Sequence, residues 1–175
     1  FKNSTFDLIN CDQVLHHTNN VEKTLENFKK ISNKKAIFYL YVYAKKSIPR
    51  ELLDERFRTW SKNLSHKDLM KLSEELTNLG RTLSKIDNKI NFPKVELLGI
   101  KSKKQTVQRF IYDNFLKCFW NPDFGFEKSK LVNYDWYAPS NARRFNKKEF
   151  LTLLSKFNLK IDFLHEAPEC FSGRF

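Results

Sequence analysis

The segment FDLINCDQVLHHTNN, residues 6–20, decides how the chain is expected to fold. A short apolar strand runs from Phe6 to Asn10 and ends in a polar turn that contains two histidines. An amphipathic helix, VEKTLENFKKIS (21–32), follows, and then comes a strongly apolar strand, AIFYLYVY (36–43). A strand, a helix and a second strand in this order predict a βαβ unit, and therefore an α/β fold.

The helix and the second strand carry complementary apolar patterns. The strand has almost no polar residues, which is typical of a strand covered on both faces in a parallel sheet. Residues 32–35 are expected to form the turn between the two elements. The helix is predicted to bury one face because its apolar residues recur at helical spacing: Val21, Leu25, Phe28 and Ile31.

The chain is strongly basic, with a net charge of +12 and a pI of about 9.6. Such a charge can indicate a nucleic-acid or anionic-membrane partner. Here the lysines are scattered along the chain, and this favours a solvated surface over a nucleic-acid interface. No apolar run reaches the roughly 18 to 20 residues that a membrane-spanning helix needs, so we expect no membrane span.

The three cysteines, Cys11, Cys118 and Cys170, are far apart and include no CxxC pair. This spacing does not predict a metal site, and a sparse, odd set suggests reduced thiols in the cytoplasm. The chain starts at Phe1 with no signal-peptide pattern, so we expect it to be part of a longer chain.

The middle of the chain changes to helical patterning. Helices are predicted over 50–60, from a Ser65 cap to about residue 86, and over 104–120, while residues 125–146 are expected to be irregular and aromatic. The second helix is predicted to bury a narrow seam of apolar residues: Leu69, Leu72, Leu76, Leu79, Leu83 and Ile86.

The last part returns to α/β patterning. Asn146 followed by Glu149 predicts a capped helix, with strands over 159–164 and 169–175 after it. The expected organisation is therefore a partial core over 1–43, a helical insertion over 44–144 and a return to the core over 145–175.

The amino-acid sequence of these segments resembles that of the class I S-adenosylmethionine-dependent methyltransferases. FDLI and VLHH in the first segment, RFIYDNFLKCFWN and VNYDWYAP in the middle and FNKKEF near the end carry the resemblance. It implies the carboxyl-terminal part of a Rossmann-like sheet, strands four to seven with the seventh antiparallel, and a long helical insertion that forms a lid or substrate pocket. The function implied is methyl transfer from S-adenosylmethionine to a small-molecule acceptor.

The same resemblance implies a partner. In the family, a Gly-rich loop after the first strand and an acidic residue after the second hold the methyl donor. The four glycines here, Gly80, Gly99, Gly125 and Gly173, form no such loop. Both features would precede Phe1, in a missing N-terminal half of the same chain. The chain alone is then expected to bind the donor poorly.

By resemblance, polar residues after the first strand would line the donor: Asn10, Cys11, Asp12, Gln13 and His17. The position of these residues, just past the carboxyl end of a strand, agrees with where ligands sit in open α/β sheets. Simple turn formation and helix capping would explain Asp12 and Gln13 equally well. A cysteine at position 11 could line the site without reacting.

His16 and Asp135 are the candidate catalytic bases, because a base helps to remove a proton from a hydroxyl or amine acceptor. A structural histidine, and an Asp135 paired with Arg143 or Arg144, are the competing interpretations. The candidate substrate-binding residues are mostly aromatic, and ordinary core packing would also account for them: Tyr41, Tyr43, Tyr134, Trp136, Tyr137 and Arg109.

Two other functions compete with methyl transfer. A basic nucleic-acid-binding module would need basic and aromatic residues on one face and would lose affinity steeply with added salt. A non-catalytic methyltransferase-like partner would complete its fold with another chain. An apolar edge strand at residues 6–10, left uncovered, would be an aggregation hazard and would favour that idea.

Overall fold

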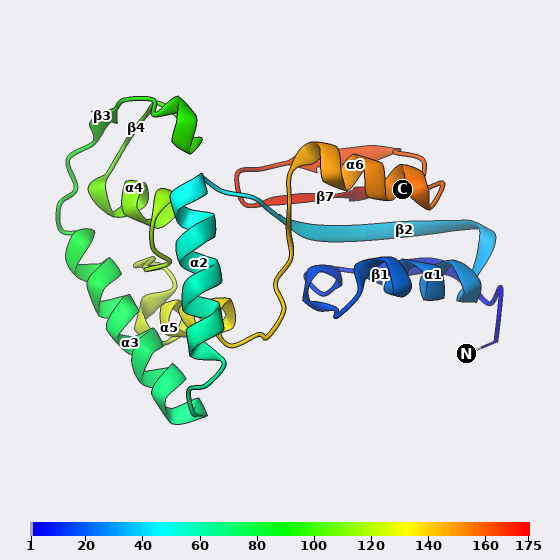
Figure 1. Ribbon diagram of the computed structural model, residues 1–175, viewed down its shortest axis with the longest axis horizontal. Coiled ribbons are helices and arrows are strands. Elements are labelled where there is room, and N and C mark those ends of the chain that lie inside the picture. Colours follow the sequence, from blue (N-terminus) through cyan, green and yellow to red (C-terminus); the bar gives the residue numbers. More distant parts are fainter. Residues whose placement is uncertain (1) are drawn as a thin grey trace. The chain divides into compact units, whose positions relative to one another are not determined.

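The computed structural model describes residues 2–175, and it separates into two compact units (Figure 1). The sheet unit comprises the chain up to Lys45 together with Asn141–Phe175. The helical unit comprises Lys46–Ser140. The fold is mixed α/β, as the βαβ pattern predicts.

The sheet unit is built on a mixed sheet with strand order β1-β2-β7-β6. Strand β1 (Phe6–Cys11) runs parallel to β2 (Ser32–Ala44), and helix α1 (Val21–Ile31) connects them. Strand β7 (Cys170–Arg174) lies between β2 and β6 (Phe163–Glu166) and is antiparallel to both. The short β5 (Arg144–Phe145) pairs with the end of β2.

Local sequence signals account for the two helices of this unit. The Asn20 side chain accepts a hydrogen bond from the backbone of Lys23 and caps α1. A full capping box between Asn146 and Glu149 starts α6 (Lys147–Lys156), as predicted. The two helices pack their apolar faces on one side of the sheet, and the core there includes Leu25, Phe38, Phe145, Phe150 and Leu154.

The opposite face of the sheet is open and partly apolar. Leu8 is 53% exposed and Phe163 is 58% exposed, and Ile37 and Tyr39 on the same face are exposed too. The prediction that β2 is covered on both faces is therefore wrong. Parallel strands are normally covered on both sides, so this face has the composition of a buried surface without a covering layer.

The helical unit contains four α-helices among the described residues, and α3 packs on α5 while α2 contacts α4 and α5. A two-stranded sheet and one 3-10 turn, η2 (Glu96–Leu98), complete it. Its helices and strands are α2 (Ile48–Ser61), α3 (His66–Leu83), β3 (Ile90–Phe92), β4 (Lys103–Gln105), α4 (Val107–Asn114) and α5 (Gly125–Tyr137).

Several element predictions in this unit are wrong. The helix predicted over 104–120 ends at Asn114, and the irregular region predicted from Gly125 is helix α5. In α3 the buried stripe is Ser73, Leu76, Thr77 and Gly80, while Leu79 of the predicted seam is exposed. Ile86, also predicted to belong to the seam, is exposed and lies beyond the end of the helix at Leu83.

The errors in α3 and α5 share a cause. Helix α5 buries Ser129 and Asn133 but exposes Leu131, so its apolar periodicity does not mark its buried face. The buried polar groups satisfy one another instead: Asn133 donates to the Thr77 hydroxyl at 2.8 Å.

In the sheet unit, smaller differences concern boundaries. Residues 32–35, predicted as a turn, already belong to β2, and the strand predicted over 159–164 begins only at Phe163. The strand predicted over 169–175 is confirmed as β7.

Candidate functional site

The carboxyl end of β1 leads into the polar turn that carries most of the predicted site residues. Asp12 and Gln13 are exposed, and Gln13 has a positive φ of 57°, which a non-glycine residue seldom adopts. The 3-10 helix η1 (Leu15–His17) follows and brings the two histidines back against β2. The unusual backbone at Gln13 thus sets the direction of the turn.

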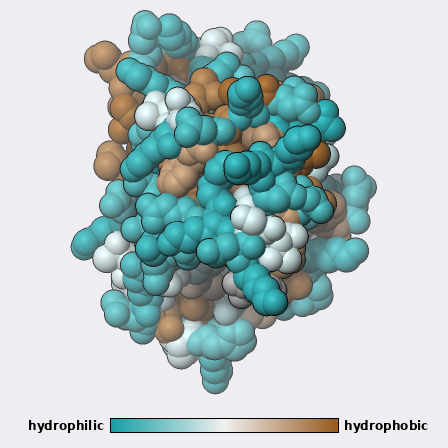
Figure 2. Space-filling model, turned by 90° about the vertical axis from the view of Figure 1, so that its right-hand side faces the viewer, coloured by the Kyte–Doolittle hydropathy of each residue, from teal (hydrophilic) through white to brown (hydrophobic). Residues whose placement is uncertain are grey.

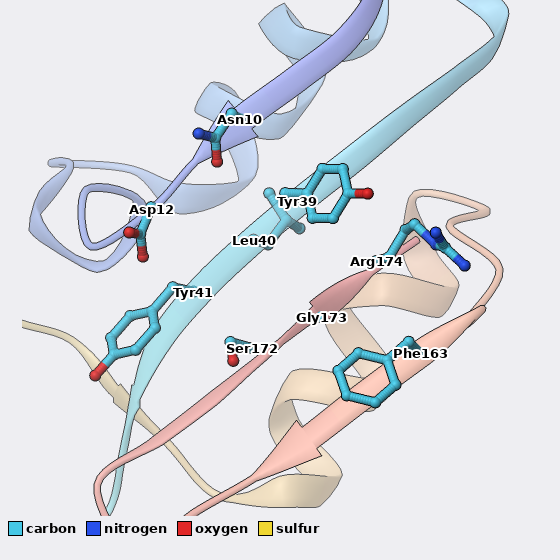
Figure 3. Close-up of a pocket in the computed structure, with 9 residues that line it drawn as sticks. All are labelled: Asn10, Asp12, Tyr39, Leu40, Tyr41, Phe163, Ser172, Gly173 and Arg174. Carbon is cyan, nitrogen blue, oxygen red and sulfur yellow. The ribbon is translucent and has the colours of Figure 1, made fainter.

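A recess of about 340 Å³ lies on the open face of the sheet next to this turn. Figure 3 shows its lining side chains, which come from four strands and from the turn after β1. Three of the predicted site residues line it: Asn10, Asp12 and Tyr41. The other lining residues carry no sequence signal of a site: Tyr39, Leu40, Phe163, Ser172, Gly173 and Arg174.

Strand alternation could have found part of this second group. Tyr39 and Tyr41 are two residues apart on β2, so they project from the same face of the sheet. Ser172 pairs with Tyr41, and Arg174 pairs with Tyr39, in the β2–β7 register. That register follows from tertiary folding, because 131 to 135 residues separate the paired positions (172−41 and 174−39).

A cluster of aromatic rings lies beside the recess, and Tyr41 belongs to both. The His16 ring lies 3.8 Å from the Tyr43 ring and 6.0 Å from the Tyr41 ring, measured between ring centroids. The His17 ring lies 5.6 Å from Tyr43 in an edge-on arrangement. The structure therefore brings together both histidines and both predicted tyrosines of β2.

The two histidines differ in access and orientation. His16 is fully buried, and its backbone carbonyl accepts a hydrogen bond from Arg143. His17 is half-buried, and its Nδ1 lies 2.6 Å from the backbone oxygen of Asn141. Because a carbonyl only accepts, Nδ1 of His17 carries the proton, and Nε2 of the neutral ring is left as an acceptor.

Other titratable groups of this unit are placed for packing. Burial raises the pKa of the Cys11 thiol, so Cys11 is not an activated nucleophile. Burial, with a hydrogen bond to Cys170, raises the pKa of the Tyr41 phenol well above its usual range. Both groups remain protonated and neutral near pH 7.

The remaining predicted residues belong to the helical unit. Asp135 is exposed and forms no ion pair within that unit, whereas Trp136 and Tyr137 are buried. The Tyr134 hydroxyl lies 2.9 Å from Nδ1 of His66. Arg109 pairs with Asp113 at 3.0 Å.

The basic residues are distributed over both units and many are paired. Figure 2 shows one face of the molecule on which hydrophilic residues predominate, with hydrophobic residues gathered toward its upper left. Exposed lysines pair with nearby glutamates in the described part of the chain, including Lys23–Glu26, Lys45–Glu149, Lys71–Glu75, Lys94–Glu96 and Lys147–Glu166.

Comparison of the chain with protein-family models, with curated proteins and with solved structures finds no match. Among residues 2–175, no helix has the length and apolar character to cross a membrane. The same residues contain no group of three or more His, Cys, Asp or Glu side chains arranged to hold a metal ion.

Proposed function

We propose that the chain is the carboxyl-terminal part of a class I S-adenosylmethionine-dependent methyltransferase that acts on a small molecule. The observation that carries the proposal is the topology of the sheet unit. A parallel β1-α1-β2 unit is completed by β7, which lies antiparallel between β2 and β6. The resemblance implies this chain order of strands, and it also implies an antiparallel last strand.

The residues present suit one side of a methyl-donor site. Asn10 and Asp12 line the recess at the carboxyl end of β1, where ligands of open α/β sheets sit. The Asp12 carboxylate would bind the ammonium group of the donor's amino-acid end, and the Asn10 amide would hydrogen-bond to the same end of the donor. The bound donor supplies a methyl group for in-line displacement, which requires that donor and acceptor be held in line.

His17 is the best candidate for the base of the proposed reaction. The Asn141 carbonyl fixes the ring and its tautomer, so that Nε2 can accept a proton from a hydroxyl or amine. His16, the base suggested by the sequence, is fully buried and packed on Tyr43. A positioning role for His16, beneath the site, suits this environment better.

The rest of the donor site would come from a preceding segment of the same protein. The glycine-rich loop and the ribose-binding acid implied by the resemblance are not among these 175 residues. The open apolar face of the sheet is a surface that a further layer of an α/β fold would cover. Three buried free cysteines suit a reducing compartment, so we place the proposed enzyme in the cytoplasm.

The first experiment is to sequence the coding DNA upstream of Phe1. A strand followed by a GxGxG-type loop and, about 20 residues later, an acidic residue would support the proposal. A start codon immediately upstream of Phe1 would overturn it, because no donor-anchoring loop could then exist.

The second experiment measures donor affinity in the complete protein by titration calorimetry. Asp12→Ala is expected to weaken donor binding at least about tenfold, or about 1.4 kcal/mol. Asp123→Ala, which changes an exposed aspartate of the helical unit, serves as the matched control. Unchanged affinity in Asp12→Ala would remove Asp12 from the site, and no donor binding by the complete protein would refute the function.

A further inference from the structure

Helix α2 is turned with its charged face inward. Arg50, Asp54 and Arg58 follow one another at intervals of four residues, and all three are buried in the helical unit. Leu52 on the same helix is 63% exposed. Charged side chains are almost never fully buried unless they are paired, and Arg50 and Asp54 of this helix pair with each other.

Lys117 lies in the same interior and is surrounded by aromatic rings. Its ammonium group lies 4.6 Å from the centroid of Trp136, 5.1 Å from that of Tyr112 and 5.8 Å from that of Phe119. It donates one hydrogen bond, to the Tyr112 hydroxyl at 3.0 Å. Among the described residues it forms no ion pair with a carboxylate, and the Tyr112 hydroxyl is the one side-chain acceptor found for its three N–H donors.

Arg50 faces the same rings as Lys117. Its guanidinium lies 5.4 Å from the Tyr112 centroid and 5.3 Å from the Trp136 centroid, and its Nε pairs with Oδ2 of Asp54 at 2.8 Å. Oδ1 of Asp54 is buried without a hydrogen-bond partner. With Lys117 protonated, Arg50, Lys117 and Asp54 carry two positive charges and one negative charge.

We propose that Lys117 and Arg50 form a binding site for an oxyanion, the carboxylate or phosphate group of a small-molecule ligand. One negative charge would balance the charges of Arg50, Lys117 and Asp54 and accept hydrogen bonds from Lys117, and buried polar groups are rarely left unsatisfied. Oδ1 of Asp54 would accept a hydrogen bond from a hydroxyl or amine of the same ligand. Lys117 and Trp136 are both buried, each with 7% of its surface exposed, so the ligand would reach them only through a local opening of the helical unit.

The identity of this ligand rests on the proposed function. If the protein is a methyltransferase, the ligand is the methyl acceptor, a small acid that carries a hydroxyl or amine to be methylated. The oxyanion site itself requires only the helical unit, because all of its residues lie within 46–140.

Binding to this site is coupled to proton uptake. Burial, followed by the charge of Arg50, lowers the pKa of Lys117 from its usual 10.5 to about 7. A bound anion favours the protonated amine, so affinity is expected to rise about tenfold as the pH falls from about 8 to about 6. The charged groups that act on Lys117 come from three helices: Arg50 and Asp54 of α2, Arg109 of α4 and Asp135 of α5.

The test is a titration of the ¹⁵N-labelled chain with sodium acetate and, separately, with sodium phosphate, at constant ionic strength made up with sodium chloride. The indole N–H signal of Trp136, assigned with Trp136→Phe, reports binding. Affinities at different pH values are compared with acetate only, because phosphate itself changes charge near neutral pH. Lys117→Met is the test variant, and Lys128→Met, at an exposed position of α5, is its matched control.

A saturable shift that strengthens toward low pH, persists in Lys128→Met and weakens at least tenfold in Lys117→Met is the expected result. A response to acetate alone indicates a carboxylate ligand, and a response to phosphate alone indicates a phosphate ester. No saturable shift, or equal shifts in the two variants, would overturn the proposal. If Lys117→Met does not fold, the test is the pH dependence of acetate affinity in the unaltered chain. An acetate affinity that does not change with pH refutes the site.

The titration contains no methyl donor, so its outcome is separate from that of the donor experiment. A complete protein that binds the donor without any oxyanion response would refute this inference and leave the proposed function intact.

Discussion

Replacing Lys117 by methionine is expected to stabilise the protein at neutral pH. The substitution keeps a long, flexible side chain among the three aromatic rings but removes an amine that burial forces toward its neutral form. The unfolded chain holds a proton on Lys117 up to its usual pKa of 10.5, whereas the folded chain releases it near pH 7. At neutral pH the chain must therefore release part of the proton on Lys117 in order to fold, and this lowers the free energy of unfolding.

The size of the effect follows from the pKa. A fall from 10.5 to about 7 costs about 5 kcal/mol of folding free energy, at about 1.4 kcal/mol for each pKa unit. Lys117→Met also loses the hydrogen bond to Tyr112 and the contacts with aromatic faces, which together contribute about 1–3 kcal/mol. The expected net gain at pH 7 is about 2–4 kcal/mol.

The sign changes with pH in a defined window. Between about pH 7 and pH 10.5 the unfolded state binds more protons, so the stability of the unaltered protein rises with pH. The advantage of Lys117→Met is then expected to shrink steadily and to reverse near the top of this range. Below about pH 7 both states hold the proton, and the advantage is constant.

The assay is urea unfolding followed by circular dichroism at several pH values between about 6 and about 10. Lys128→Met is the control, and its difference from the unaltered chain should stay within about 0.5 kcal/mol at every pH. A Lys117→Met variant that is less stable at pH 7, with a difference that does not depend on pH, would refute the reasoning.

Three further substitutions test the sheet unit by urea unfolding. Gly173→Ala would place a methyl group against the backbone carbonyl of Phe163, so a loss of about 1–3 kcal/mol is expected; unchanged stability would show that β6 can move aside. Asn146→Ala removes the hydrogen bond to the backbone of Glu149 and should cost about 1 kcal/mol, and no loss would mean that the cap is dispensable. Phe150→Ala empties a fully buried position and should cost about 3–5 kcal/mol; a cost below about 1 kcal/mol would contradict the packing of α6 on the sheet.

The parts of the fold that could be predicted are those with strong local signals. Helix α1, Val21–Ile31, begins at the predicted residue and ends one residue before the predicted end, because its apolar residues face the core at helical spacing. The start of α6 follows from the Asn146 capping box, which is contained in four consecutive residues. Each of these local patterns predicts the structure of its own segment, because the interactions involved lie within that segment.

Helices α2 and α5 show why the remainder could not be predicted as well. Both bury polar side chains and expose leucines, so apolar periodicity points to the wrong face. Burial of Arg50 is tolerable only because Asp54 and the aromatic rings lie around it. That environment depends on where α4 and α5 pack, which no local pattern contains.

The candidate site divides in the same way. Asn10 and Asp12 were predictable, because a polar turn after an apolar strand marks the carboxyl edge of a sheet. Phe163 and Arg174 join them in the recess only after β6 and β7 have paired beside β2. The different environments of His16 and His17 likewise required the structure, since the carbonyl that orients His17 comes from Asn141.

The sequence by itself determined that this is an α/β protein with a β1-α1-β2 unit, a capped α6 and a polar turn at the end of β1. These features depend on interactions between residues a few positions apart. Tertiary structure alone decided the place of β7 between β2 and β6, the uncovered face of the sheet and the buried Arg50–Lys117 cluster. The physical reason is that strand register, desolvation and the burial of charge depend on which distant segments supply the neighbouring atoms.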